Sequence, residues 1–259
     1  MGMKTFLRWI FFAVVWRVAF LSLTAQAAEV TVAVAANFTA PMQKIAQAFE
    51  KDTGHKALLA FGSTGKFYAQ IKNGAPFSIL LAADDETPLR LEKEGATVVG
   101  ARFTYAIGRL ALWSKNPSLV DGKGQVLLES ADKSSFKRLA IADPKLAPYG
   151  AAAVEVMQRT GVLARLSSKL VQGDSIGQAF QFVVTENAEL GFVALSQIWM
   201  EGRITQGSAW VIPQNLYTPL KQDAVLLQTG KANPAALALM QYLRSDVAQI
   251  IVRSYGYAL

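Results

Sequence analysis

The residues of this chain that could do chemistry lie in four short turns, each placed between an apolar run and a helical pattern. The turns carry Asn37, the pair Ser63 and Thr64, Tyr149, and Ser175. In open α/β sheets, ligands bind beyond the carboxyl ends of the strands, where such turns lie. Their amide, hydroxyl and phenol groups can donate hydrogen bonds, as can the free backbone N–H groups at a helix start.

The turn GSTGK at residues 62–66 is similar to a phosphate loop but lacks two of its parts. A Walker loop reads G-x-x-x-x-G-K-[ST], whereas Ala60 stands at the first glycine position here and Phe67 follows the lysine. With no hydroxyl placed for Mg²⁺, a nucleotide-hydrolysing loop is excluded. A small polar turn that opens a helix remains, and Ser63 and Thr64 there would favour an anion. The alternative is an ordinary helix cap without a ligand.

The segment GDSIG matches the G-x-S-x-G nucleophile elbow of serine hydrolases. No histidine follows Ser175, and the single histidine, His55, lies far upstream, so the general base is missing. We expect Ser175 and Gln178 to form a capping box, which leaves the N–H of Ile176 as an anion donor. An exported serine hydrolase using Ser175 remains a remote alternative, and His55 is expected to be a solvated turn residue.

The nominated positions are all neutral. Ala36 and Asn37 follow the first apolar run, and Tyr149 stands at a helix start in the second half of the chain. Neutral donors suit a fully ionised oxyanion, whereas a protonated anion would also need an acceptor. An amino-acid site would more often show an arginine and a carboxylate. Asp143 and Asp174 are interpreted as turn or cap residues, because a bare carboxylate would repel a dianion.

Two alternating sets of strands and helices position these turns. In the first set, strands are expected at 29–36, 56–61 and 77–83 and helices at 37–54 and 64–74, which predicts a parallel β-α-β-α-β sheet. A long strand-like stretch at 102–115 is a candidate crossover. The second set has strands at 138–143, 169–173, 190–195, 209–213 and 223–228, helices at 149–161 and 175–187, and C-terminal helical segments at 233–245 and 247–256.

The patterns predict two α/β lobes. Residues 28–106 and 223–259 are assigned to the first lobe and residues 107–222 to the second. Two short strand crossovers between the lobes would allow a hinge rather than a flexible tether.

Residues 1–27 have the features of a signal peptide. Lys4 and Arg8 precede an apolar segment that ends in Ala25-Gln26-Ala27, an A-x-A cleavage site. Arg17 interrupts that segment, which disfavours the alternative of an uncleaved membrane anchor. The leader carries these three basic residues and no acid, so its removal lowers the net charge from +7 to +4. This mild positive charge would attract anions, but no Lys/Arg stripe points to nucleic acid.

Cysteine is absent, and histidine occurs once. Thiol catalysis, cysteine metal sites and His-rich metal sites are therefore excluded. The charged fraction is 17% and the hydrophobic fraction 52%, so the chain can bury a substantial core.

From residue 28 onward the chain resembles, nearly end to end, the periplasmic molybdate-binding proteins (ModA) of molybdate ABC transporters. The resemblance is carried by VAVAANF, FGSTGKFYAQIKNGAPF, LLAADD, FTYAIGRLALWS, ADPKLAPYG, GDSIGQAF and LGFVALSQI, in that order. It implies a class II periplasmic binding protein: two α/β lobes, a two-strand hinge and a ligand cleft between the lobes. It also implies a monomer that captures molybdate and tungstate in the periplasm and delivers them to an inner-membrane ABC permease, without catalysis or a cofactor.

The resemblance implies that uncharged groups hold molybdate through its oxygens. Carried over to this sequence, these groups belong to Ala36, Asn37, Ser63, Thr64, Tyr149 and Ile176. Some family members add a tyrosine from the strand LGIVY, but this chain has Ala194 there and lacks that side-chain donor. The nearest alternative is the same module binding sulfate or chromate. A structural or adhesion module is a further alternative, besides the serine hydrolase.

Overall fold

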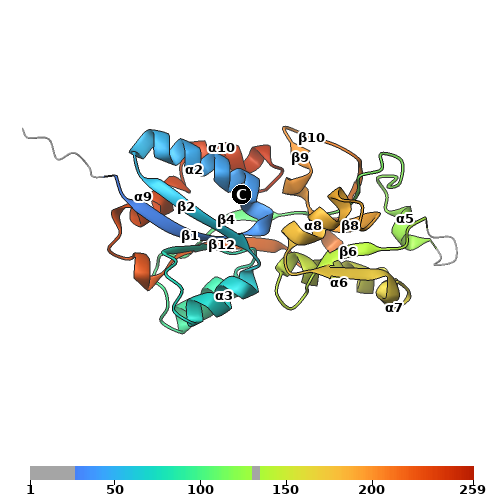
Figure 1. The fold of residues 1–259 in the computed structure, drawn as a ribbon, viewed down its shortest axis with the longest axis horizontal. Helices are drawn as coiled ribbons and strands as arrows, with labels where there is room; N and C mark the ends of the chain where they lie inside the picture. The colour runs from blue at the N-terminus through green and yellow to red at the C-terminus, as the bar shows by residue number, and fades with distance from the viewer. Residues whose placement is uncertain (1–26, 130–134) are drawn as a thin grey trace, which may run out of the picture.

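The computed structural model describes residues 27–129 and 135–259, which form two lobes side by side along the longest axis of the molecule (Figure 1). Each lobe is built on its own five-stranded sheet. The expected signal peptide, apart from Ala27, lies outside the described residues.

The first lobe contains the start and the end of the chain. Its sheet has the order β2-β1-β3-β12-β4. The strands are β1 (Glu29–Ala35), β2 (Lys56–Gly62), β3 (Ile79–Leu81), β4 (Phe103–Gly108) and β12 (Leu220–Leu226). The helices are η1 (Ala36–Phe38), α2 (Thr39–Thr53), α3 (Thr64–Lys72), α4 (Glu86–Lys93), η6 (Gln228–Gly230), α9 (Pro234–Tyr242) and α10 (Asp246–Ser254). The first three strands are parallel as expected, but β12 is antiparallel to both of its neighbours, so the complete sheet is mixed.

The second lobe is formed by the middle of the chain. Its sheet has the order β11-β5-β8-β6-β7. The strands are β5 (Leu110–Ser114), β6 (Leu139–Ala142), β7 (Leu170–Gly173), β8 (Leu190–Ala194) and β11 (Ser208–Val211), with a hairpin of β9 (Trp199–Met200) and β10 (Arg203–Ile204). The helices are α5 (Gln125–Leu128), α6 (Pro148–Arg159), α7 (Leu163–Leu166), η3 (Ser167–Lys169), α8 (Ile176–Val184), η4 (Leu195–Gln197) and η5 (Gln214–Leu216).

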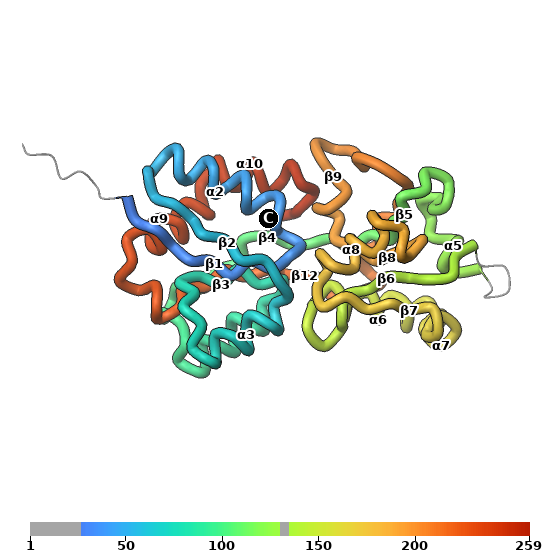
Figure 2. Tube along the Cα trace, viewed as in Figure 1, coloured from blue at the N-terminus to red at the C-terminus, as the bar shows by residue number. Residues whose placement is uncertain are grey.

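Two segments connect the lobes, as the tube in Figure 2 shows. The strand-like stretch 102–115 is two strands in different sheets, with Arg109 between β4 and β5. The return runs from β11 to β12, and the Tyr217 hydroxyl accepts a hydrogen bond from the Leu110 N–H at 3.1 Å. Because Gly108 still pairs with Leu220 in the first sheet, the expected lobe boundaries at 106/107 and 222/223 fall inside β4 and β12.

Helix α2 shows how local sequence places the strand ends. Met42, Ile45 and Phe49 recur at helical spacing and are fully buried in the core of the first lobe. Burial of each such side chain is worth about 1.5–3 kcal/mol. Gly54 ends the helix with a positive φ of 73°, as expected of a C-cap glycine. The helix is thereby held against the sheet, with the turn at Asn37 at its amino end.

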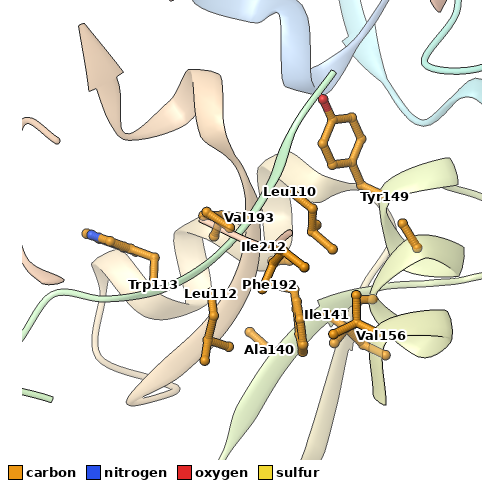
Figure 3. Close-up of a cluster of buried hydrophobic side chains, with 14 of the residues drawn as sticks. Leu110, Leu112, Trp113, Ala140, Ile141, Tyr149, Val156, Phe192, Val193 and Ile212 are labelled. Atoms are coloured by element: carbon orange, nitrogen blue, oxygen red, sulfur yellow. The ribbon is translucent and has the colours of Figure 1, made fainter. Parts of the chain in front are cut away.

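The second lobe has a separate apolar core, seen in Figure 3. Leu110, Leu112 and Trp113 on β5 pack there with Phe192 on β8 and Ile141 on β6. Each sheet has its own core, and Ala35 and Ala83 of the first lobe also pack against the second, so relative motion of the lobes would uncover only this contact.

Candidate functional site

The four turns selected from the sequence meet at one small pocket between the lobes. All six nominated residues line it: Ala36, Asn37, Ser63, Thr64, Tyr149 and Ile176. The rest of the lining is small or apolar, from Ala35, Gly62, Ala83, Ala147 and Pro148. Both lobes contribute, so the pocket is complete only when they are close together.

Helix starts point to this pocket from both lobes. Helix α3 begins at Thr64, α6 at Pro148, α8 at Ile176, and the short η1 at Ala36. The first N–H groups of a helix have no partner within it, and the helix dipole is positive at this end. Several helix starts around one pocket therefore favour a negatively charged ligand.

Ser63 and Thr64 present hydroxyl groups at the start of α3. The Ser63 Oγ is buried and has no hydrogen-bond partner within the described part of the chain. The Thr64 Oγ1 accepts from the Ala83 N–H at 2.9 Å, which leaves its own hydrogen to donate. A buried hydroxyl without a partner costs about 1–3 kcal/mol. A ligand oxygen in the pocket would remove that cost at Ser63.

The side chain of Asn37 is held by other protein groups. Its Nδ2 donates to Gln222 Oε1 at 2.8 Å and to the Tyr257 hydroxyl at 3.0 Å, so both amide hydrogens are used. Its backbone oxygen accepts from Ser196 Oγ at 2.7 Å. In this conformation both amide hydrogens of Asn37 are used while its Oδ1 is buried without a partner in the described part of the chain, so a side-chain donor to a ligand at Asn37 stays a prediction. Its backbone N–H, at the start of η1, is the group left to face an anion.

Tyr149 extends from α6 toward the other lobe. Figure 3 shows its ring leaving the apolar cluster of the second lobe, with the hydroxyl near the ribbon of the first. The hydroxyl oxygen accepts from Gln222 Nε2 at 3.0 Å. Burial, and next the nearby Tyr257, raise the pKa of Tyr149 well above its usual range. The phenol is therefore a neutral donor at physiological pH.

The charges around the pocket are few and lie outside it. Among the described residues that line the pocket, none has a charged side chain. Lys66 and Asp174 form an ion pair from one lobe to the other, and Asp143 Oδ1 accepts from the Lys145 N–H at 2.8 Å, as a turn residue does. Within residues 27–129 and 135–259, no cluster of His, Asp or Glu side chains is placed to hold a metal ion.

The G-x-S-x-G segment caps a helix. Ser175 Oγ accepts from the Gln178 N–H at 3.3 Å, as expected, but Gln178 Oε1 accepts at 2.6 Å from the N–H of Asp174, one residue before the position that a capping box uses.

His55 is more than a solvated turn residue, because its Nδ1 accepts from the Ala28 N–H at 3.1 Å. In the part of the chain that the structure describes, no helix has the length and apolar character needed to span a bilayer.

Sequence reasoning missed the polar groups directly behind the pocket. Gln222, Tyr105, Tyr257 and Ser196 are all buried and bond to one another or to Asn37. The available signal was a run of three polar residues, Lys221-Gln222-Asp223, inside strand β12.

Two lobes and a polar pocket at their boundary are features of solute-binding proteins, and the comparisons agree. The family model described as bacterial extracellular solute-binding protein matches residues 30–258. A solved structure titled Azotobacter vinelandii periplasmic molybdate-binding protein superposes with a TM-score of 0.84 at 38% identity, covering 89% of this chain and 99% of that one.

Known proteins of similar sequence identify the family within the solute-binding proteins. The molybdate-binding protein ModA of Azotobacter vinelandii is 60% identical over 239 residues, which is 92% of this chain and 93% of that protein. The protein of the same name from Rhodobacter capsulatus is 52% identical, covering 92% and 91%. The chain therefore belongs to the bacterial extracellular solute-binding proteins and, within them, to the ModA family.

Proposed function

We propose that this protein is a solute-binding protein that captures molybdate and tungstate and delivers them to the permease of an ABC transporter. The observation that carries the proposal is the uncharged pocket between the lobes, lined by helix starts and by the unpartnered Ser63 hydroxyl. Its relatives named as molybdate-binding proteins supply the identity of the anion.

The proposed ligand contacts come from both lobes. The first lobe supplies the N–H groups at Ala36 and Asn37 and the hydroxyls of Ser63 and Thr64. The second supplies the Tyr149 hydroxyl and the Ile176 N–H. Hydrogen bonds to a charged acceptor are stronger than neutral ones, so a dianion gains from each donor without a buried counter-charge.

Ligand capture is coupled to closure of the lobes. In the present structure they touch beside the pocket, where the Gly65 N–H donates to the Leu146 oxygen at 2.9 Å. Rotation about the two connecting segments, near Arg109 and between β11 and β12, would open the pocket to solvent. The anion binds best to the state in which both donor sets surround it, and this difference in affinity favours closure.

The remaining assignments follow from this role. A solute-binding family implies no catalysis, and Ser175 serves as a helix cap. Export with cleavage near Ala27 would place the mature protein in the periplasm, as a monomer whose lobes meet between β4 and β5 and between β11 and β12. The inner-membrane permease is its expected partner.

The test is a calorimetric titration of the leaderless protein after extensive dialysis, in buffer free of sulfate and phosphate. Molybdate and tungstate are expected to bind tightly at one site, and sulfate and phosphate weakly or not at all. Sulfate binding as tight as molybdate binding would instead support the broader oxyanion carrier. Binding of none of the four would contradict the proposed function.

A further inference from the structure

We propose that Gln222 is a positioning residue that directs the hydroxyl hydrogen of Tyr149 into the anion pocket when the lobes close. This inference rests on the proposed function. Gln222 does not line the pocket, yet it is fully buried and bonds directly to two of the residues that do.

In this structure the Gln222 amide presents its oxygen to Asn37 and its nitrogen to Tyr149. Its Oε1 lies 2.8 Å from Asn37 Nδ2, which is a donor, and 3.0 Å from the Tyr105 hydroxyl. With the oxygen on that side, Nε2 faces Tyr149 at 3.0 Å. An amide nitrogen has no lone pair to offer, so it can only donate there.

The orientation of the amide decides how Tyr149 behaves. A phenol has one hydrogen, and its oxygen can also accept. Because the Tyr149 oxygen accepts from Gln222, its hydrogen can be donated to another acceptor, either a ligand or the neighbouring Tyr257 hydroxyl. A reversed amide would present Oε1 and take that hydrogen away from the pocket. Gln222 thus makes Tyr149 a donor toward an anion.

The bond between Gln222 and Tyr149 also joins the lobes at the hinge. Gln222 lies on β12 in the first sheet, beside an irregularity in its pairing with β4, while Tyr149 opens α6 in the second lobe. Gly108 ends β4 next to both residues. A methyl group at Gly108 would lie 2.2 Å from the Tyr149 oxygen and 2.3 Å from Gln222 Nε2. Such contacts are far too short, so the absence of a side chain at Gly108 is what lets the two groups meet.

The same geometry makes the arrangement dependent on closure. Gln222 and Tyr149 belong to different sheets, so separation of the lobes breaks their bond. The Tyr149 donor is therefore correctly oriented only in the closed state, which is the state that encloses the ligand. This adds to the difference in affinity between the closed and the open protein.

A double-mutant cycle tests the inference. Molybdate dissociation constants are measured by calorimetry for the wild type, Gln222→Met, Tyr149→Phe and the double variant. If Gln222 acts through the Tyr149 hydroxyl, each single substitution weakens binding ~10-fold or more, and the double variant is no weaker than the worse single one. Effects that multiply in the double variant would overturn the inference.

Two controls separate positioning from general damage. Tyr242→Phe removes a phenol that bonds Asp52 in the first lobe and does not line the pocket, and Gln228→Met removes an amide that bonds the Thr97 oxygen in the same lobe. Both are expected to keep affinity within ~2-fold. Thermal unfolding without ligand checks that each variant is folded.

Gly108→Ala perturbs the contact between Gln222 and Tyr149 without replacing either residue. It is the variant to measure if Gln222→Met does not fold. It is expected to weaken molybdate binding ~10-fold or more, and unchanged affinity would contradict the inference. Failure of the wild type to bind molybdate would contradict the proposed function itself. Tight wild-type binding with independent effects of the two substitutions would contradict only the role of Gln222.

Discussion

The side chains of Lys66 and Asp174 form an ion pair that bridges the two lobes beside the anion pocket. Lys66 lies in the first turn of α3 in the first lobe, and Asp174 precedes α8 in the second. Both side chains are substantially exposed, at 45% and 64%. An exposed pair adds little to folding stability, typically about 0–1 kcal/mol. Because the ion pair joins the lobes, it stabilises the closed state rather than the fold of either lobe.

Reversal of the charge at Lys66 is expected to speed release of molybdate, because Lys66→Glu would face Asp174 with a like charge. The expected change is ~2–5-fold at low salt and smaller at high salt, where screening weakens exposed pairs. Stopped-flow release measurements at two ionic strengths check it. Lys66→Glu combined with Asp174→Lys restores the pair and should restore slow release. A swap variant as fast as Lys66→Glu would show that the pair does not hold the lobes together.

Removal of the Ser63 hydroxyl should separate affinity from stability. Ser63→Ala deletes a buried group without a partner, so the free energy of unfolding without ligand should not fall, whereas molybdate affinity should drop ~10-fold or more. Urea unfolding and calorimetric titration measure the two quantities. Ser114→Ala, which removes a hydroxyl bonded to the Glu189 oxygen in the second lobe, is the opposite control: lower stability, unchanged affinity.

Thr64→Val should lower both the free energy of unfolding and the affinity for molybdate. The Ala83 N–H would lose its acceptor, which costs about 1–3 kcal/mol of stability, and the ligand would lose a donor. Thr64→Ser keeps the hydroxyl and should recover most of both losses. Full stability in Thr64→Val would show that the bond to Ala83 is unimportant.

Ionisation of the tyrosines should not change the affinity for molybdate between pH 7 and pH 10. Burial raises the pKa values of Tyr105 and Tyr149 well above the usual range, and it also raises the pKa of Tyr257. A raised pKa means that each phenol keeps its hydrogen throughout this window. Calorimetry at several pH values checks the prediction. A decline in affinity that begins below pH 10, and that is absent in Tyr149→Phe, would contradict it.

Asp84→Asn should stabilise the protein above pH 6. Burial raises the pKa of Asp84 to about 6, although its carboxylate accepts from the Thr87 N–H at 2.7 Å. An unfolded aspartate has a pKa of about 3.9. The folded protein therefore binds this proton more tightly, and the wild type loses stability as pH rises from about 4 to about 6.

The asparagine has no charge to bury, so its advantage should reach about 1–3 kcal/mol at pH 7–8 and shrink toward pH 4. Urea unfolding at each pH measures the difference. A variant less stable than the wild type at pH 8, or an advantage that grows in acid, would show that the ionised carboxylate is favourable in the folded state.

Local patterns in the sequence predicted most of the longer elements, although not helix α4, and they selected the neutral donors proposed for the site. Helical spacing of Met42, Ile45 and Phe49 predicted α2, and Gly54 predicted its end, because both depend on interactions within a few residues. The turns at Asn37, Ser63, Tyr149 and Ile176 were identified by their types and their places between strand and helix.

Tertiary structure decided which of these groups are free to act. Asn37 was expected to offer its amide, but that amide bonds to Gln222 and Tyr257, which are 185 and 220 residues away. No local pattern predicts such a contact, because it depends on how β12 and the C-terminal segment dock. The pairing of Lys66 with Asp174 is of the same kind, since it exists only between lobes. The sequence alone thus determined two α/β lobes with neutral donors at their strand ends. Docking of distant segments determined which donors face the pocket, because hydrogen-bond partners are set by proximity in space.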